Sequence, residues 1–116
     1  MAKYIPTEYE ECLPLVELME ILRLKFSHIH HEMFTRSWKQ KNKAKALVVR
    51  PGVPDCIIIV GEKLVFIEMK RIVGSKVSDA QRDWLAAINT CTSVEAHICR
   101  GYKEAEQLIN NLRSNE

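Results

Sequence analysis

The fold is decided by residues 55–70, which read DCIIIVGEKLVFIEMK. Two apolar, β-branched runs flank Gly61 and Glu62, a pattern that predicts two strands joined by a tight hairpin turn. Glycine in the first turn position favours a two-residue type II′ turn, which pairs Val60 with Lys63. The turn therefore fixes the register of the whole hairpin.

Counting along this ladder sets Asp55 directly opposite Glu68. Side chains alternate along a strand, so Asp55, Glu68 and Lys70 share one face and converge on one end of the hairpin. The remaining residues are apolar on both faces: Ile57, Ile59, Leu64 and Phe66 on the charged face, and Cys56, Ile58, Val60, Val65, Ile67 and Met69 on the other. A sheet of this kind needs cover on both sides.

Helical patterns on either side of the hairpin can supply that cover. Thr7 and Glu10 form a capping box before helically spaced apolar residues, which predicts a first helix of about four turns, although Pro14 leaves its start open. Residues 28–46 have no clear period, and we expect a loop or a short irregular helix there.

The second half of the chain continues with a helix, a strand and a helix. Ser78 and Gln81 form another capping box, which predicts a helix over residues 78–89. An alternating run predicts a third strand over residues 94–99, and an apolar stripe between residues 105 and 112 predicts a last helix. The expected fold class is α/β, a three-layer α/β/α sandwich around a central mixed sheet, with residues 1–116 as one domain.

The composition narrows the class of protein. The N-terminus has no basic start followed by an apolar run, and no stretch approaches the roughly 20 apolar residues that span a bilayer. The four cysteines are scattered without a CxxC pair, which favours neither a zinc site nor a disulfide framework. We expect a cytoplasmic protein with reduced thiols.

The positive charge is unevenly distributed along the chain. Net charge is only +2, yet residues 33–54 contain no Asp or Glu. Such a segment can follow a phosphate backbone, because neutralising phosphates supplies most sequence-independent affinity for nucleic acid. The cations predicted to contact DNA are Arg36, Lys39, Lys41, Lys43, Lys45 and Arg50, together with Arg71 and Lys76 just after the hairpin.

The charged end of the hairpin predicts a divalent-metal site. Asp55, Glu68 and the Met69 carbonyl offer the hard oxygen ligands that Mg²⁺ or Mn²⁺ takes, with water and phosphate completing the shell. Such a metal activates water and neutralises charge at a phosphodiester, and Lys70 could orient the water, stabilise the transition state or assist proton transfer. In the competing interpretation, Asp55 is an ordinary turn residue, and Glu68 and Lys70 are solvated residues near the end of a strand. Against it, Glu68 interrupts an apolar run, where an unpaired carboxylate is costly to desolvate.

Three segments together resemble the virus-type replication-repair nuclease (VRR-NUC) family of PD-(D/E)XK nucleases. They are Gly52-Val-Pro-Asp55, Phe66-Ile-Glu-Met-Lys70 and Ser78-Asp-Ala-Gln81. The resemblance implies a restriction-endonuclease-like core and a divalent-metal DNA endonuclease, with Asp55 and Glu68 as metal ligands and Lys70 as the catalytic lysine.

The resemblance implies further roles. Gln81 becomes a polar partner beside the site, and its alternative is a capping residue that bonds the Ser78 amide. An acidic residue of the first helix becomes an additional ligand, for which we predict Glu11, with Glu8 as the competitor.

The resemblance also bears on substrate and assembly. This chain looks like a stand-alone bacterial or phage member, which implies a homodimer acting in DNA repair on branched DNA such as four-way (Holliday) junctions. The alternatives are a non-catalytic DNA-binding or assembly module on the same fold, or a nicking or restriction-type nuclease.

Overall fold

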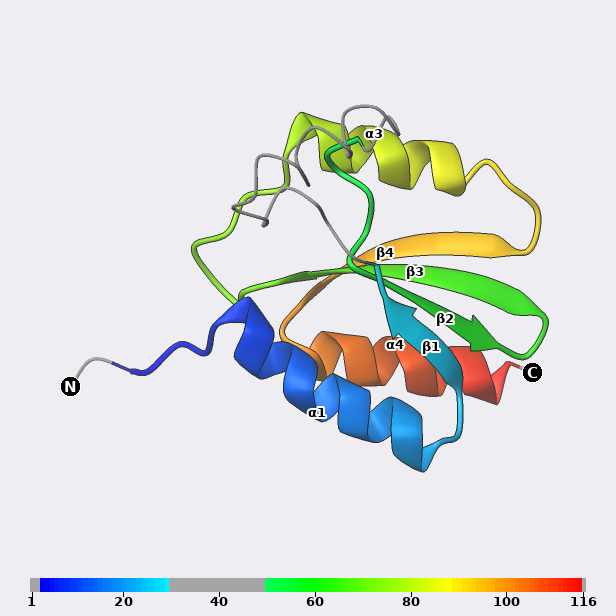
Figure 1. Ribbon diagram of the computed structural model, residues 1–116, viewed down its shortest axis with the longest axis horizontal. Coiled ribbons are helices and arrows are strands. Elements are labelled where there is room, and N and C mark those ends of the chain that lie inside the picture. Colours follow the sequence, from blue (N-terminus) through cyan, green and yellow to red (C-terminus); the bar gives the residue numbers. More distant parts are fainter. Residues whose placement is uncertain (1–2, 30–49, 116) are drawn as a thin grey trace, which may run out of the picture.

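The computed structural model describes residues 3–29 and 50–115, which form a four-stranded sheet with helices on both faces (Figure 1). Helices α1 and α4 cover one face and α3 covers the other, so the predicted three-layer α/β/α sandwich is confirmed. None of the helices in this part of the chain is long and apolar enough to cross a bilayer. The elements are α1 (Glu8–Ile21), β1 (Lys25–His28), β2 (Cys56–Val60), β3 (Lys63–Lys70), α3 (Asp79–Ile88), β4 (Val94–Arg100) and α4 (Tyr102–Ser114).

The sheet is mixed, with strand order β1-β2-β3-β4. Strands β1, β2 and β3 pair antiparallel, and β4 pairs parallel to β3 through the α3 crossover. The predicted hairpin register is confirmed, because Val60 pairs with Lys63 and Cys56 with Ile67. Gly61 has φ 60°, as the first central residue of a type II′ turn requires.

Both predicted capping boxes are present. Thr7 Oγ1 accepts a hydrogen bond from the Glu10 amide at 3.1 Å, and Glu10 Oε1 accepts one from the Thr7 amide at 3.1 Å. Pro14 lies within α1, which continues to Ile21 as one helix. The N-cap bonds satisfy amides that the first turn leaves without partners, so the capping residues set where α1 and α3 begin.

Strand β1 was not predicted from the sequence. Residues Lys25–His28 contain one apolar side chain, Phe26, which is too little for a strand pattern. The strand forms because its backbone extends the sheet: Phe26 pairs with Ile58, and the Ile29 amide donates to the Asp55 carbonyl at 2.7 Å. The rest of the segment expected to be a loop or irregular helix lies outside the described residues.

The core lies between the sheet and the α1/α4 layer. Cys56, Ile58, Val65, Ile67 and Met69 are buried from the strands, as the alternation predicted. They pack against four buried side chains of the two helices, which are Leu15, Met19, Ala105 and Ile109.

The face toward α3 is less tightly covered: Ile59 is 44% exposed and Trp84 36% exposed.

The outer edge of β4 is partly blocked by side chains. The Asn89 amide, at the C-terminal end of α3, accepts from the Ala96 N–H at 2.9 Å and donates to the Ala96 carbonyl at 3.0 Å. Further along the strand, Glu104 Oε1 accepts from the Arg100 N–H at 2.8 Å. These bonds occupy backbone groups that a neighbouring strand would otherwise use.

Candidate active site

The unequal lengths of β2 and β3 create the site. Strand β2 begins at Cys56, whereas β3 runs on to Lys70, so within residues 3–29 and 50–115 the end of β3 has β4 on one side and no strand on the other. The Met69 N–H on that open side donates to Asp55 Oδ2 at 2.8 Å. Asp55 therefore takes the position of a missing strand partner, level with Glu68.

The loop before Asp55 is held against the start of α3. Gly52 has φ 95°, and a Cβ built there would lie 2.6 Å from the backbone carbon and oxygen of Ala80. Only glycine permits both this backbone conformation and this approach. The contact brings Asp55 and the first turn of α3 to the same end of β3.

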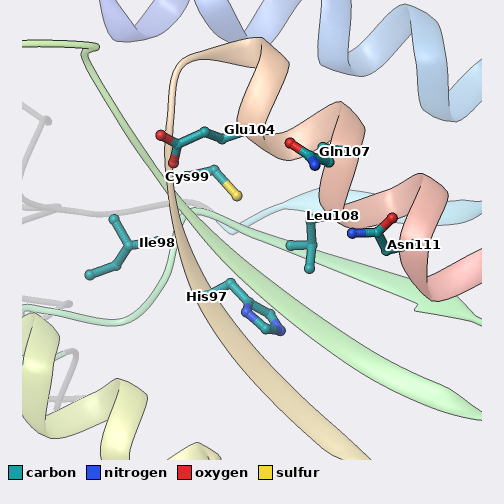
Figure 2. Close-up of a pocket in the computed structure, with 7 residues that line it drawn as sticks. All are labelled: His97, Ile98, Cys99, Glu104, Gln107, Leu108 and Asn111. Atoms are coloured by element: carbon teal, nitrogen blue, oxygen red, sulfur yellow. The ribbon is translucent and has the colours of Figure 1, made fainter.

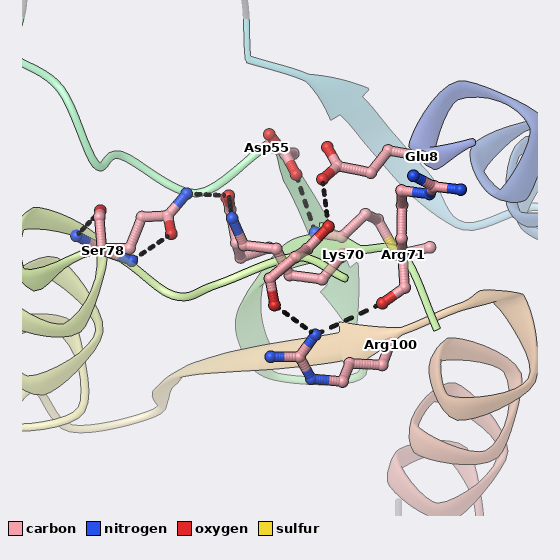
Figure 3. A network of polar contacts seen from close by, with 10 residues as sticks. Glu8, Asp55, Lys70, Arg71, Ser78 and Arg100 are labelled. Carbon is pink, nitrogen blue, oxygen red and sulfur yellow. Dashed lines mark hydrogen bonds and ion pairs between the residues drawn. The ribbon is translucent and has the colours of Figure 1, made fainter. Parts of the chain in front are cut away.

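Gln81 performs both of the roles considered from the sequence. Its Oε1 accepts from the Ser78 N–H at 2.9 Å, which completes the capping box. Its Nε2 donates to Glu68 Oε1 at 2.6 Å (Figure 3). The Gln81 side-chain amide thus connects the N-cap of α3 to the Glu68 carboxylate. Because its oxygen is bonded to the Ser78 N–H, its NH₂ group faces Glu68.

Glu68 and Lys70 are both buried, with exposed fractions of 4% and 8%. Lys70 Nζ lies 3.9 Å from Glu68 Oε1. The pKa of Glu68 is raised from its ordinary 4.5 to about 8, mainly by burial and next by the neighbouring Asp55 carboxylate, whose effect is larger than the lowering by Lys70. The site therefore places more negative charge in a desolvated position than its own lysine compensates.

One oxygen of the Glu68 carboxylate, Oε2, is buried without a hydrogen-bond partner among the residues that the structure describes. A buried acceptor of this kind is costly unless a cation or donor reaches it, which is the condition that a divalent ion would meet.

The side chains alone do not complete a metal shell. Within residues 3–29 and 50–115, no group of three His, Cys, Asp or Glu side chains could hold a metal ion. Two carboxylates with a backbone carbonyl and water are still a suitable set for Mg²⁺, which keeps several waters. Met69 offers such a carbonyl, because the N–H and C=O of one strand residue point toward the same neighbour and its N–H faces Asp55.

The two acidic candidates of α1 point to different places. Glu11, the predicted additional ligand, accepts a hydrogen bond from the Tyr102 backbone N–H at the start of α4. Glu8 accepts from Ser75 Oγ at 3.5 Å, and its charge contributes to the raised pKa of Glu68. This placement favours Glu8 over Glu11 as the helix acid of the site (Figure 3).

Three of the eight predicted DNA-contacting cations lie in the described part of the chain. Arg50 and Lys76 are exposed, and the Arg71 guanidinium donates to the carbonyls of Pro6 at 3.4 Å and Ile5 at 3.3 Å. The other five fall outside the described residues: Arg36, Lys39, Lys41, Lys43 and Lys45.

Arg100 is a residue of the site region that the sequence did not reveal. It pairs with Lys70 in the parallel register, and its Nη1 donates to the carbonyls of Ser75 at 3.0 Å and Arg71 at 3.4 Å. The sequence alone does not show that β4 runs parallel to β3 and ends beside it. That information would have placed Arg100 next to Lys70.

A separate hollow of about 280 Å³ lies between β4 and α4 (Figure 2). It shares no residue with the Asp55, Glu68 and Lys70 group. Its lining consists of His97, Ile98, Cys99, Glu104, Gln107, Leu108 and Asn111.

Comparisons with known proteins agree with this geometry. The family model of the VRR-NUC domain matches residues 5–103. A solved structure described as a VRR_NUC domain protein superimposes with a TM-score of 0.76 and 18% sequence identity, covering 97% of this chain and 93% of that one. No curated protein matches the sequence. The match over residues 5–103 includes Asp55, Glu68, Lys70 and Gln81, and the chain therefore belongs to the VRR-NUC family, whose domain is of nuclease type.

Proposed function

We propose that this protein is a divalent-metal-dependent endonuclease that hydrolyses phosphodiester bonds in DNA. The observation that carries the proposal is the buried Glu68 carboxylate, whose Oε2 has no hydrogen-bond partner among the described residues and whose Oε1 lies 3.9 Å from Lys70 Nζ. Two acids and an amine at the open end of a strand suit a phosphodiester better than an apolar ligand. Membership of a nuclease-type family agrees with DNA as the substrate.

Mg²⁺ or Mn²⁺ would be held by Asp55, Glu68 and the Met69 carbonyl, with Glu8, whose charge contributes to the raised pKa of Glu68, as a further acid. When bound, such an ion acidifies water and neutralises charge on the phosphate oxygens. The raised pKa of Glu68 supports this assignment, because a cation stabilises the ionised carboxylate that burial otherwise disfavours.

The chain's own residues orient the reaction. Water forms a bond to phosphorus while the bond to the leaving deoxyribose oxygen breaks, and negative charge builds on the non-bridging oxygens. The Lys70 ammonium can donate to one of these oxygens, or to the attacking water, from a buried position where its charge is weakly screened. Gln81 keeps Glu68 in place through its 2.6 Å hydrogen bond.

The preferred substrate in this proposal is branched DNA, such as a four-way junction. One site cuts one strand, so symmetric cleavage of a junction requires a two-fold dimer. Arg50, Arg71 and Lys76 provide cations in the described part of the chain, and the segment from Arg36 to Lys45 stays a predicted DNA contact.

The proposal is tested with purified protein, Mg²⁺ or Mn²⁺, and labelled linear and four-way DNA. Asp55→Asn and Lys70→Met should each reduce cleavage by about a thousandfold, because each removes a charge used in the transition state. Lys103→Met changes an exposed lysine of α4 and is the matched control, with activity expected to equal that of the wild type.

Two outcomes contradict the proposal. One is equal cleavage by the wild type and the Asp55 and Lys70 variants. The other is tight, salt-sensitive DNA binding without cleavage in either metal, which is the behaviour of a non-catalytic module.

A further inference from the structure

The loop between β3 and α3 carries two exposed aliphatic side chains directly after the site. Ile72 is 52% exposed and Val73 50% exposed. They follow Lys70 by two and three residues, so they lie within about 7–10 Å of it along the chain. Single exposed aliphatic residues are ordinary on protein surfaces, but an adjacent pair beside a buried lysine calls for an explanation.

The loop is braced on several sides (Figure 3). The Arg100 guanidinium bonds the carbonyls of Arg71 and Ser75, which flank the apolar pair. Ser75 also donates to Glu8 of α1, and the Arg71 side chain donates to the carbonyl of Pro6. The two side chains are thus presented from a held backbone.

The loop faces open space at Gly74, and basic residues border it in the sequence. Gly74, the next residue, has φ 86°, and a Cβ built there would meet nothing within 4 Å. Ile72 Cγ1 lies on the protein side, 2.9 Å from a Cβ built at Gly101. The basic residues Arg71 and Lys76 border the loop, which suits a polyanion whose bases offer apolar faces.

We infer that Ile72 and Val73 form an apolar wedge that enters a base step of the DNA next to the phosphate held at Lys70. This inference rests on the proposed nuclease function. DNA-binding proteins use aliphatic wedges of this type to unstack and kink a duplex, which costs stacking energy at the opened step. The cost is lower where bases are already loosened, so the wedge would favour branch points and mismatches.

Binding is measured with 2-aminopurine placed beside the cleavage position, in Ca²⁺ to support binding without rapid cleavage. Wild-type protein should raise the fluorescence as the base unstacks, and Ile72→Ser/Val73→Ser should abolish the rise. Ile21→Ser, at the far end of α1 and 76% exposed in the wild type, is the matched control and should behave as the wild type.

Cleavage gives a second readout. The double variant should lose about tenfold in kcat/KM on fully paired DNA, because it no longer contributes to unstacking. It should lose much less on DNA with a two-base mismatch at the same place. The conservative Ile72→Val/Val73→Ile variant should restore both readouts, and Val73→Ser alone serves if the double variant unfolds.

Three results overturn the wedge. The first is an unchanged fluorescence rise in the double variant, and the second is an equal loss of kcat/KM on paired and mismatched DNA. The third is a double variant that sediments as a monomer while the wild type sediments as a dimer, which would make the loop a subunit contact. A wild-type fluorescence rise without any metal-dependent cleavage would support the wedge while contradicting the nuclease proposal.

Discussion

The two faces of the sheet use the same strands for different purposes. On the α1/α4 face, every β3 residue from Val65 to Met69 that points inward is apolar and buried. On the α3 face the same strand carries Glu68 and Lys70, and Ile59 of the neighbouring strand is nearly half exposed. The closed face holds the fold, and the stability it provides permits a strained set of charges on the other face.

The difference shows that burial has opposite consequences for the two kinds of side chain. Removing apolar surface from water stabilises the fold, whereas removing a carboxylate from water destabilises it unless a cation compensates. Substitutions on the two faces should therefore change the free energy of unfolding by different amounts. Their effects should also differ in how they depend on pH and on bound metal.

The largest expected effect comes from the closed face. Ile67→Ala removes a fully buried side chain and should lower the free energy of unfolding by about 4 kcal/mol. Ile59→Ala, on the half-open face, should cost less than about 1 kcal/mol. Urea unfolding of both variants measures the two losses in free energy of unfolding. Equal losses would contradict the division of the sheet into a closed and an open face.

The next effect concerns pH. The pKa of Glu68 is about 8 in the folded protein against an ordinary 4.5. Both states bind the proton below about pH 4.5, and only the folded state keeps it as pH rises toward 8, so stability falls across this window. With a chelator present, Glu68→Gln should match the wild type near pH 5 and exceed it at pH 8.5 by roughly 2–4 kcal/mol.

Magnesium sharpens this test. Mg²⁺ should stabilise the wild type at pH 8.5, because it binds the ionised carboxylate, and should have little effect on Glu68→Gln. Parallel stability curves for the two proteins, with and without Mg²⁺, would show that Glu68 does not titrate as a buried acid.

The smallest effect separates the two ends of the Gln81 amide. Gln81→Glu keeps an oxygen for the Ser78 cap but loses the donor to Glu68, whereas Gln81→Leu loses both. The leucine variant should lose about 1 kcal/mol of stability from the cap. DNA cleavage should fall by about tenfold in the leucine variant, as expected for a lost hydrogen bond to a charged group, and by more in the glutamate variant, whose carboxylate also repels Glu68. Full activity in the glutamate variant would mean that Gln81 acts only as a cap.

Local patterns were sufficient to predict most of the fold. The glycine turn fixed the register of β2 and β3, and with it the approach of Asp55 to Glu68. The Thr7 and Ser78 caps marked the starts of α1 and α3. These features depend on residues close together in the sequence, which is why they can be read from it.

Features that depend on how distant segments pack together could not be predicted from the sequence. Strand β1 exists because β2 offers a free edge, and its own residues carry little signal. The choice between Glu8 and Glu11 depends on how α1 packs beside α4, where Glu11 bonds the Tyr102 amide. Arg100 reaches the loop after Lys70 only because β4 runs parallel to β3.

The blocked rim of β4 has a consequence for behaviour at high concentration. A bare outer strand lets one molecule add its own strand to the next, which is the first step toward fibres and other insoluble aggregates. Here the Asn89 amide imitates a partner strand at Ala96, and Glu104 occupies the Arg100 amide. These bonds hinder strand addition at this rim, and they leave the opposite edge of the sheet, at β1, as the other place where a strand could add.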